Sequence, residues 1–141
     1  MTKLDSLYEF ARDNTIDIVQ ASLLHKKKAM CMFIKPDKVI FLNKAAIETK
    51  DEEVSILAEE IGHFETGALY MIRSTYNTPI ARSNRIKYEA KAKRWAIKKC
   101  LPPQEIEKAF KHVGSNYHAV AEHCNVTVEF LRTAIEYYKT L

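Results

Sequence analysis

Hydrophobic and polar residues follow two different rhythms along the chain, and the change from one to the other divides it into elements. Apolar residues recur at helical spacing between Leu4 and Ala11. Thr2 and Asp5 fit a capping box at the start of this run, and the pattern fades at Asp13-Asn14. We therefore expect a short N-terminal helix.

Two apolar, β-prone runs follow, at 29–34 and 39–42. They are separated by Lys35-Pro36-Asp37-Lys38, a turn in which the proline presets the bend. These runs predict a β-hairpin. The second run could accept an extended substrate by β-strand addition, although an exposed sheet edge is also a common structural feature without a function.

Helical patterning then continues to the end of the chain. The predicted helices are 50–66, 83–100, 104–113, 117–123 and 128–139. The breaks between them are Leu101-Pro102-Pro103, Gly114 and Asn125-Val126-Thr127. The order of helix, small sheet and further helices predicts an α+β fold, and we expect residues 1–141 to form a single domain.

Composition limits the class of protein. No run approaches the roughly 20 apolar residues that span a bilayer, and the first residues lack the apolar stretch of a secretory signal. We therefore expect a cytoplasmic protein that does not bind a membrane. Cys31, Cys100 and Cys124 have no Cys-x-x-Cys spacing, which argues against a disulfide framework or a cysteine-based zinc site. We expect them to be reduced and buried.

The stretch Glu59-Glu60-Ile61-Gly62-His63 has the form of the zinc-protease pattern His-Glu-x-x-His with glutamate at the first ligand position. Glu59 and His63 lie one helical turn apart and can reach a common ion. Glu60 is rotated by one residue, so it can act as a general base without binding the ion. A glutamate and a histidine at this spacing are also common on exposed helix faces.

The helix that carries this motif has a separate core face. Thr49 and Glu52 fit a second capping box, and the apolar stripe consists of Val54, Leu57, Ile61 and Phe64. Glu59 and His63 face away from that stripe. Because Gly62 costs about 1 kcal/mol relative to alanine inside a helix, we expect another segment to pass close to the backbone there.

A third donor is needed for a catalytic zinc site, and the predicted helix 83–100 offers one. This helix is rich in lysine and arginine, and Glu89 is its lone acid. Glu89 projects on the same side as Ala92 and Ala96, which predicts that its carboxylate is buried. A buried carboxylate needs a cation, which would be either a metal or an arginine such as Arg85.

The basic residues form a stripe of their own at Lys87, Lys91, Arg94 and Lys98. This stripe could contact nucleic acid or an acidic partner, but a solvated lysine face is the favoured interpretation. Residues 117–138 have the rhythm of a helix-turn-helix, yet the charges of the second segment are a weak pattern for phosphate contact. We favour packing there, and we do not expect nucleic acid as a partner.

These motifs together resemble the ImmA/IrrE family of metallopeptidases. The likeness includes 57–64, which holds the metal motif, and 84–96, which holds Glu89 and is followed by Leu101-Pro102. It covers roughly residues 3–139. The resemblance implies a minimal zincin-like domain in which His63 and Glu89 match metal ligands and Glu60 matches the catalytic general base.

The resemblance also implies a function. Family members are associated with mobile elements and stress responses, and they cleave or control helix-turn-helix repressors of the phage type. We therefore expect a zinc-dependent endopeptidase that acts on such a repressor. Tyr70 and Tyr76, which follow the metal motif, and Arg85 could contact the oxyanion or the substrate, although tyrosines in such a segment often only pack.

Glu59 departs from the usual pattern of this family, although a branch with Glu-Glu-x-x-His looks similar. Two carboxylates and one imidazole would nearly neutralise a divalent ion and make it a weaker Lewis acid. Oxygen-rich ligation also allows manganese or iron in place of zinc. Catalysis therefore stays an open question. The rival hypotheses are a non-catalytic domain that binds a transcriptional regulator and a small DNA-binding protein.

Overall fold

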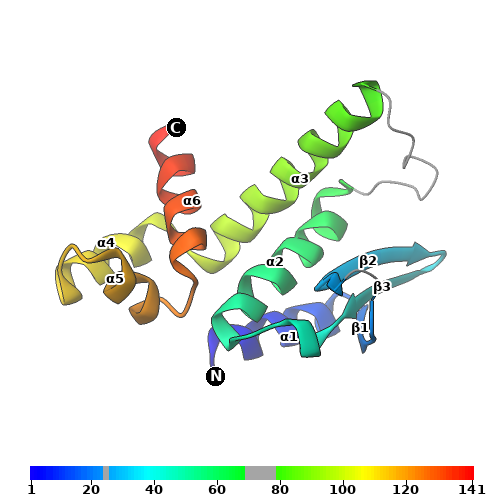
Figure 1. The fold of residues 1–141 in the computed structure, drawn as a ribbon, viewed down its shortest axis with the longest axis horizontal. Coiled ribbons are helices and arrows are strands. Elements are labelled where there is room, and N and C mark those ends of the chain that lie inside the picture. The colour runs from blue at the N-terminus through cyan, green and yellow to red at the C-terminus, as the bar shows by residue number, and fades with distance from the viewer. Residues whose placement is uncertain (24–25, 69–78) are drawn as a thin grey trace.

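The fold combines a small sheet with helices on either side of it in the chain, as the computed structural model of residues 1–23, 26–68 and 79–141 shows (Figure 1). The elements are α1 (Lys3–Asp13), β1 (Ile16–Gln20), β2 (Ala29–Ile34), β3 (Asp37–Leu42), the short 3-10 helix η2 (Lys44–Ala46), α2 (Lys50–Thr66), α3 (Pro79–Cys100), α4 (Pro103–Val113), α5 (Tyr117–His123) and α6 (Val128–Lys139). The predicted α+β fold is confirmed. No helix in this described part of the chain is long and apolar enough to cross a membrane.

The sheet has one strand more than the predicted hairpin. Its order is β1-β3-β2, with β1 parallel to β3 and β2 antiparallel to β3. Strand β1 follows α1 directly and pairs with β3, and the side chain of Ile16 on β1 is buried. The expectation that 39–42 offers a free edge for strand addition is wrong, because β3 is paired on both sides. In the described residues, β2 is an edge of the sheet.

Successive side chains of each strand point to opposite faces of the sheet, so every second residue faces the core. Cys31 lies opposite Ile40 in the register, and Ala29 lies opposite Leu42. Ala29, Ile40 and Leu42 are buried, whereas Cys31 is partly exposed. This face of the sheet packs against α2, so a residue of β2 can reach the side of α2 that carries the glutamates.

Helix α2 forms where the sequence predicts it. The Thr49 side chain accepts a hydrogen bond from the Glu52 backbone N–H, and Gly67 ends the helix in the left-handed region at φ 68°. The four residues of the predicted stripe are all buried: Val54, Leu57, Ile61 and Phe64. Burial of side chains of this size stabilises a fold by about 1.5–3 kcal/mol each, which fixes the rotation of α2 and therefore the direction of its acids.

Helices α2 and α3 lie side by side at very close range, and α3 extends beyond the end of α2 (Figure 1). A Cβ placed on Gly62 would be 2.6 Å from the Ala92 carbonyl oxygen. Ala92 and Ala96 are both fully buried. The predicted close approach at Gly62 is therefore confirmed, and it brings the side chains next to Gly62 within reach of α3.

Helices α4, α5 and α6 gather at the end of α3 away from the sheet (Figure 1). They bury Ile106, Val120 and Leu131 in the same core cluster as α2. The turn between α5 and α6 includes Asn125 in the left-handed region at φ 58°. The burial of α5 and α6 agrees with the packing interpretation of 117–138.

Candidate metal centre

His63 and Glu89 come together across the α2–α3 contact. The His63 Nε2 atom is 3.5 Å from the Glu89 Oε2 atom, and the His63 side chain is 4% exposed. The other ring nitrogen, Nδ1, is 2.7 Å from the Ala68 carbonyl oxygen. Because a carbonyl only accepts, Nδ1 carries a proton and donates this bond. In the neutral imidazole, Nε2 then presents a lone pair toward α3.

The ring of His63 is therefore held as a metal-binding histidine usually is. Such a histidine donates its second ring N–H to a carbonyl or carboxylate, which fixes the tautomer and the orientation of the free nitrogen. A lone pair that faces a carboxylate at 3.5 Å needs either a proton or another cation between the two groups. The donor chemistry of His63 and Glu89 thus fits a divalent ion.

The pKa values of this pair respond to the same contact. Burial lowers the pKa of His63, but the hydrogen bond with Glu89 and the bond to Ala68 outweigh it, and the net effect is a raised pKa. The hydrogen bond with His63 lowers the pKa of Glu89. Without a metal, a proton on His63 Nε2 lies between the imidazole and the Glu89 carboxylate.

The exposure of Glu89 corrects one prediction. Its side chain is 51% exposed, so the expectation that this acid is buried is wrong. Ala92 and Ala96, on the same side of α3, are buried because α2 covers them. Glu89 lies about one turn earlier on α3, where it contacts His63 near the end of α2. The contact with His63 lowers the pKa of Glu89 and so favours its ionised form.

Glu59 lies one turn before His63 on α2 and pairs with a cation of this chain. Lys93 Nζ is 3.6 Å from Glu59 Oε1, with the two side chains 43% and 28% exposed. Burial raises the pKa of Glu59, and Lys93 opposes that rise. Lys93 follows Glu89 by one turn, so α3 places a carboxylate beside His63 and a positively charged ammonium group beside Glu59.

Glu60 projects toward the sheet and meets Cys31 of β2. The Cys31 thiol lies close enough to the Glu60 carboxylate for each group to shift the pKa of the other. Burial raises the pKa of Glu60, and His63 partly opposes this effect. Burial and the nearby Glu60 carboxylate raise the pKa of Cys31 as well, so the thiol stays protonated. A carboxylate with a raised pKa accepts protons more readily, which suits a general base.

Three further residues were predicted to contact the substrate or the oxyanion: Arg85, Tyr70 and Tyr76. Arg85 lies on α3 one turn before Glu89 and is partly buried. Tyr70 and Tyr76 lie outside the described residues. Within the residues that the structure describes, no three donor side chains cluster closely enough to hold a metal. His63 and Glu89 meet, whereas Glu59 is turned to Lys93.

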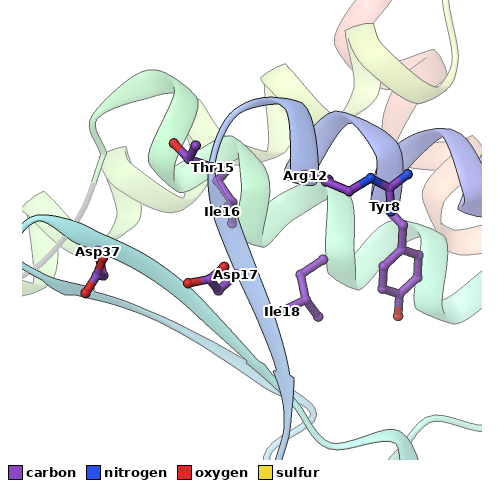
Figure 2. Close-up of a pocket in the computed structure, with 7 residues that line it drawn as sticks. All are labelled: Tyr8, Arg12, Thr15, Ile16, Asp17, Ile18 and Asp37. Carbon is purple, nitrogen blue, oxygen red and sulfur yellow. The ribbon is translucent and has the colours of Figure 1, made fainter.

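A pocket of the described residues lies away from these side chains. A cavity of about 390 Å³ opens between α1 and β1, where Figure 2 shows Tyr8 and Arg12 of α1 beside Asp17 and Ile18 of β1. None of the candidate metal or base residues lines it. The candidate site lies instead at the contact of α2 with α3, where His63 is buried and Glu89 is half exposed.

Comparison with known proteins decides the family. The IrrE N-terminal-like domain, a peptidase family, matches residues 11–136, which is most of the chain. The chain belongs to the IrrE N-terminal-like domain family. The match includes α2 and α3 in full, so the resemblance seen in the motifs is confirmed. No curated protein and no solved structure matched the chain.

Membership in this family supports a metallopeptidase type of function and implies a metal cofactor. It also points to a protein as the substrate.

Two residues of the site were not predicted from the sequence. Cys31 was expected only to be reduced and buried, yet the alternation of Ala29 and Cys31 on one face of β2 could have placed it beside α2. Lys93 was left out of the predicted basic stripe. Its spacing offered a clue, because a lysine one turn after Glu89 lies on the same side of the helix as Glu89 and faces the same neighbouring helix.

Proposed function

We propose that this chain is a metal-dependent endopeptidase whose ion is held by Glu59, His63 and Glu89 and whose general base is Glu60. The observation that carries the proposal is the His63 ring, with Nδ1 bonded to the Ala68 carbonyl and Nε2 directed at Glu89. Zinc is the preferred ion, and manganese or iron also suits a ligand set with two carboxylates.

A bound divalent ion would polarise the scissile carbonyl and make a nearby water easier to deprotonate. The residues of this chain supply the rest. Glu60 takes the proton of the attacking water as its oxygen joins the carbonyl carbon, and returns that proton to the amine as the C–N bond breaks.

The edge strand β2 is the proposed binding site for the substrate backbone. It is an edge of the sheet in the described residues, and Cys31 on this strand lies near Glu60, whose charge raises the pKa of the thiol. An extended peptide that pairs with β2 would therefore run past the general base. This assigns to β2 the role that the sequence predicted for β3.

The substrate that we propose is a helix-turn-helix repressor of the phage or mobile-element type, cleaved in the cytoplasm. This part of the proposal rests on the family, which cleaves or controls such regulators, and on the peptidase family match. Tyr70, Tyr76 and Arg85 are proposed to contact the substrate or the oxyanion. The 141 residues are proposed to act as one domain.

The test is Glu60→Gln assayed on the purified helix-turn-helix regulator encoded beside the gene for this chain. We expect cleavage to fall by at least about 100-fold, while zinc binding is kept. Glu65→Gln is the matched control, because it removes the same charge from an exposed position on the same helix. Cleavage that persists in Glu60→Gln would show that the assigned base is wrong.

A second candidate function is a non-catalytic domain that binds the regulator. The pairing of Glu59 with Lys93, and the lack of a three-donor cluster among the described residues, favour it. In that case the wild-type chain and Glu60→Gln would bind the regulator equally and neither would cleave it, with zinc or without.

A further inference from the structure

The charge of the candidate site differs from that of the usual motif by one unit. Glutamate at position 59 replaces a neutral imidazole, so Glu59, Glu60 and Glu89 bring three negative charges around one divalent ion. An ion of charge two leaves one negative charge uncompensated. The usual pattern, with two carboxylates, leaves none.

Lys93 supplies one positive charge beside Glu59, the residue that adds the extra negative charge. Its Nζ lies 3.6 Å from Glu59 Oε1, and both side chains are partly shielded from solvent. The rigid contact of Gly62 with Ala92 fixes the position of α3 at this level, one residue from Lys93. Lys93 is thus placed by packing and not by a flexible loop.

Lys93 also differs from the other lysines of α3. Lys87, Lys91 and Lys98 are exposed on the opposite side of the helix, whereas Lys93 is only partly exposed and faces α2. It is close enough to affect the Glu89 carboxylate as well. Two acids of the candidate site therefore interact with the same ammonium group.

We propose that Lys93 is a positioning residue that compensates the charge of Glu59 at the metal site, and this inference rests on the proposed metal ligands. Lys93 holds one carboxylate oxygen of Glu59 and leaves the other for the ion. Its positive charge offsets the negative charge that Glu59 adds to the ligand set. Because the ammonium group also repels the divalent ion, it lowers the affinity of the site for the metal. Glu59 with Lys93 thereby acts as one neutral donor in place of histidine.

The experiment is a zinc titration of the full chain, purified without a nickel tag and freed of metal, against a chromophoric chelator. Lys93→Met keeps the length of the side chain and removes its charge, and we expect it to bind zinc about tenfold more tightly than the wild type. Lys93→Arg keeps the charge and should bind as the wild type does. Lys91→Met is the matched control, because it removes the same charge from the exposed side of α3 and should change the affinity little.

The outcomes separate this inference from the proposed function. If the wild type binds zinc, loses it in His63→Ala, and Lys93→Met shifts the affinity no more than Lys91→Met does, the role of Lys93 is overturned and the metal site stands. If neither the wild type nor any Lys93 variant binds zinc, the metal site and the role of Lys93 both fall. A tightening confined to Lys93→Met and absent from Lys93→Arg supports the inference.

Discussion

At the scale of single residues, the site is a pair of matched contacts between two helices. On α2, Glu59 and His63 are one turn apart, and on α3 Glu89 and Lys93 are one turn apart. His63 meets Glu89 and Glu59 meets Lys93, so each acid finds a positive or proton-bearing partner. The contacts are satisfied without a metal, and His63 and Glu89 still present donor atoms to one.

The His63–Glu89 pair predicts how the stability of the metal-free protein depends on pH. Because the folded state raises the pKa of His63 from 6.5, the stability from its protonation is complete below about pH 6.5 and is lost as the pH rises through the raised value. Because the folded state lowers the pKa of Glu89 from 4.5, its contribution is present above about pH 4.5 and is lost as the pH falls through the lowered value. The pair contributes most between these limits.

Urea unfolding of the metal-free protein at pH 5.5 and pH 8.5 checks this dependence. We expect the contribution of the pair to the free energy of unfolding to be smaller at pH 8.5, so His63→Gln should reduce the difference between the two pH values. Glu65→Gln, on an exposed position of α2, should leave the difference unchanged. An unaltered difference in His63→Gln would contradict the pairing.

The sequence predicted the residues of the motif better than their surroundings. The positions of His63 and Glu89 follow from helical periodicity, since each helix has a regular buried face. The exposure of Glu89 and the partner of Glu59 do not, because they depend on where one helix ends against another. That relation is set by Gly62 and Ala92 and has no local signal for its exact register.

At the scale of elements, the contact between α2 and α3 is the feature on which the site depends. Gly62→Ala tests this contact, because the contact decides whether the substitution raises or lowers the free energy of unfolding. Alanine in place of glycine inside a helix ordinarily stabilises by about 1 kcal/mol. Here the new Cβ would be 2.6 Å from the Ala92 carbonyl oxygen, which belongs to the backbone and cannot rotate away. We expect a loss of about 1–3 kcal/mol in the free energy of unfolding.

Chemical denaturation of Gly62→Ala measures this loss, and zinc titration of the same variant shows whether the ligands have moved apart. We expect both the free energy of unfolding and the zinc affinity to decrease. A variant that is more stable than the wild type would contradict the close approach of α2 to α3 at Gly62.

The strands and helices were predictable to different degrees. The bounds of α2, α5 and α6 agree with the predicted ranges because caps at Thr49, Asn116 and Thr127 mark their starts. Strand β1 was missed because five residues with mixed burial give a weak alternation. Its parallel pairing with β3 is a long-range contact that changes β3 from an edge strand to a central one.

At the scale of the whole molecule, Lys3 ties the N-terminal helix to the C-terminal half. Its Nζ donates to Glu105 Oε1 at 2.8 Å, to the Cys124 carbonyl at 2.9 Å and to the Cys100 carbonyl. The Lys3 side chain is only 16% exposed. One ammonium group thus joins α1 to the ends of α3 and α5 and to the start of α4.

Lys3→Met removes these bonds and leaves the partly buried carbonyls of Cys100 and Cys124 without this donor. Since hydrogen bonds to charged groups contribute about 1.5–3 kcal/mol, we expect a loss of that order in the free energy of unfolding, measured with urea. Lys139→Met is the control, because the Lys139–Glu136 pair is exposed at the surface and should contribute less than about 1 kcal/mol. Equal small losses in both variants would contradict the role of Lys3.

The central claim is that Glu59, His63 and Glu89 hold one divalent ion between α2 and α3. The most direct measurement is anomalous diffraction at the zinc edge from crystals of the full chain grown with zinc. We expect one anomalous peak within bonding distance of His63 Nε2 and of a carboxylate oxygen from each glutamate, with Lys93 still beside Glu59. A map without a peak there, with His63 Nε2 still bonded directly to Glu89, would contradict it.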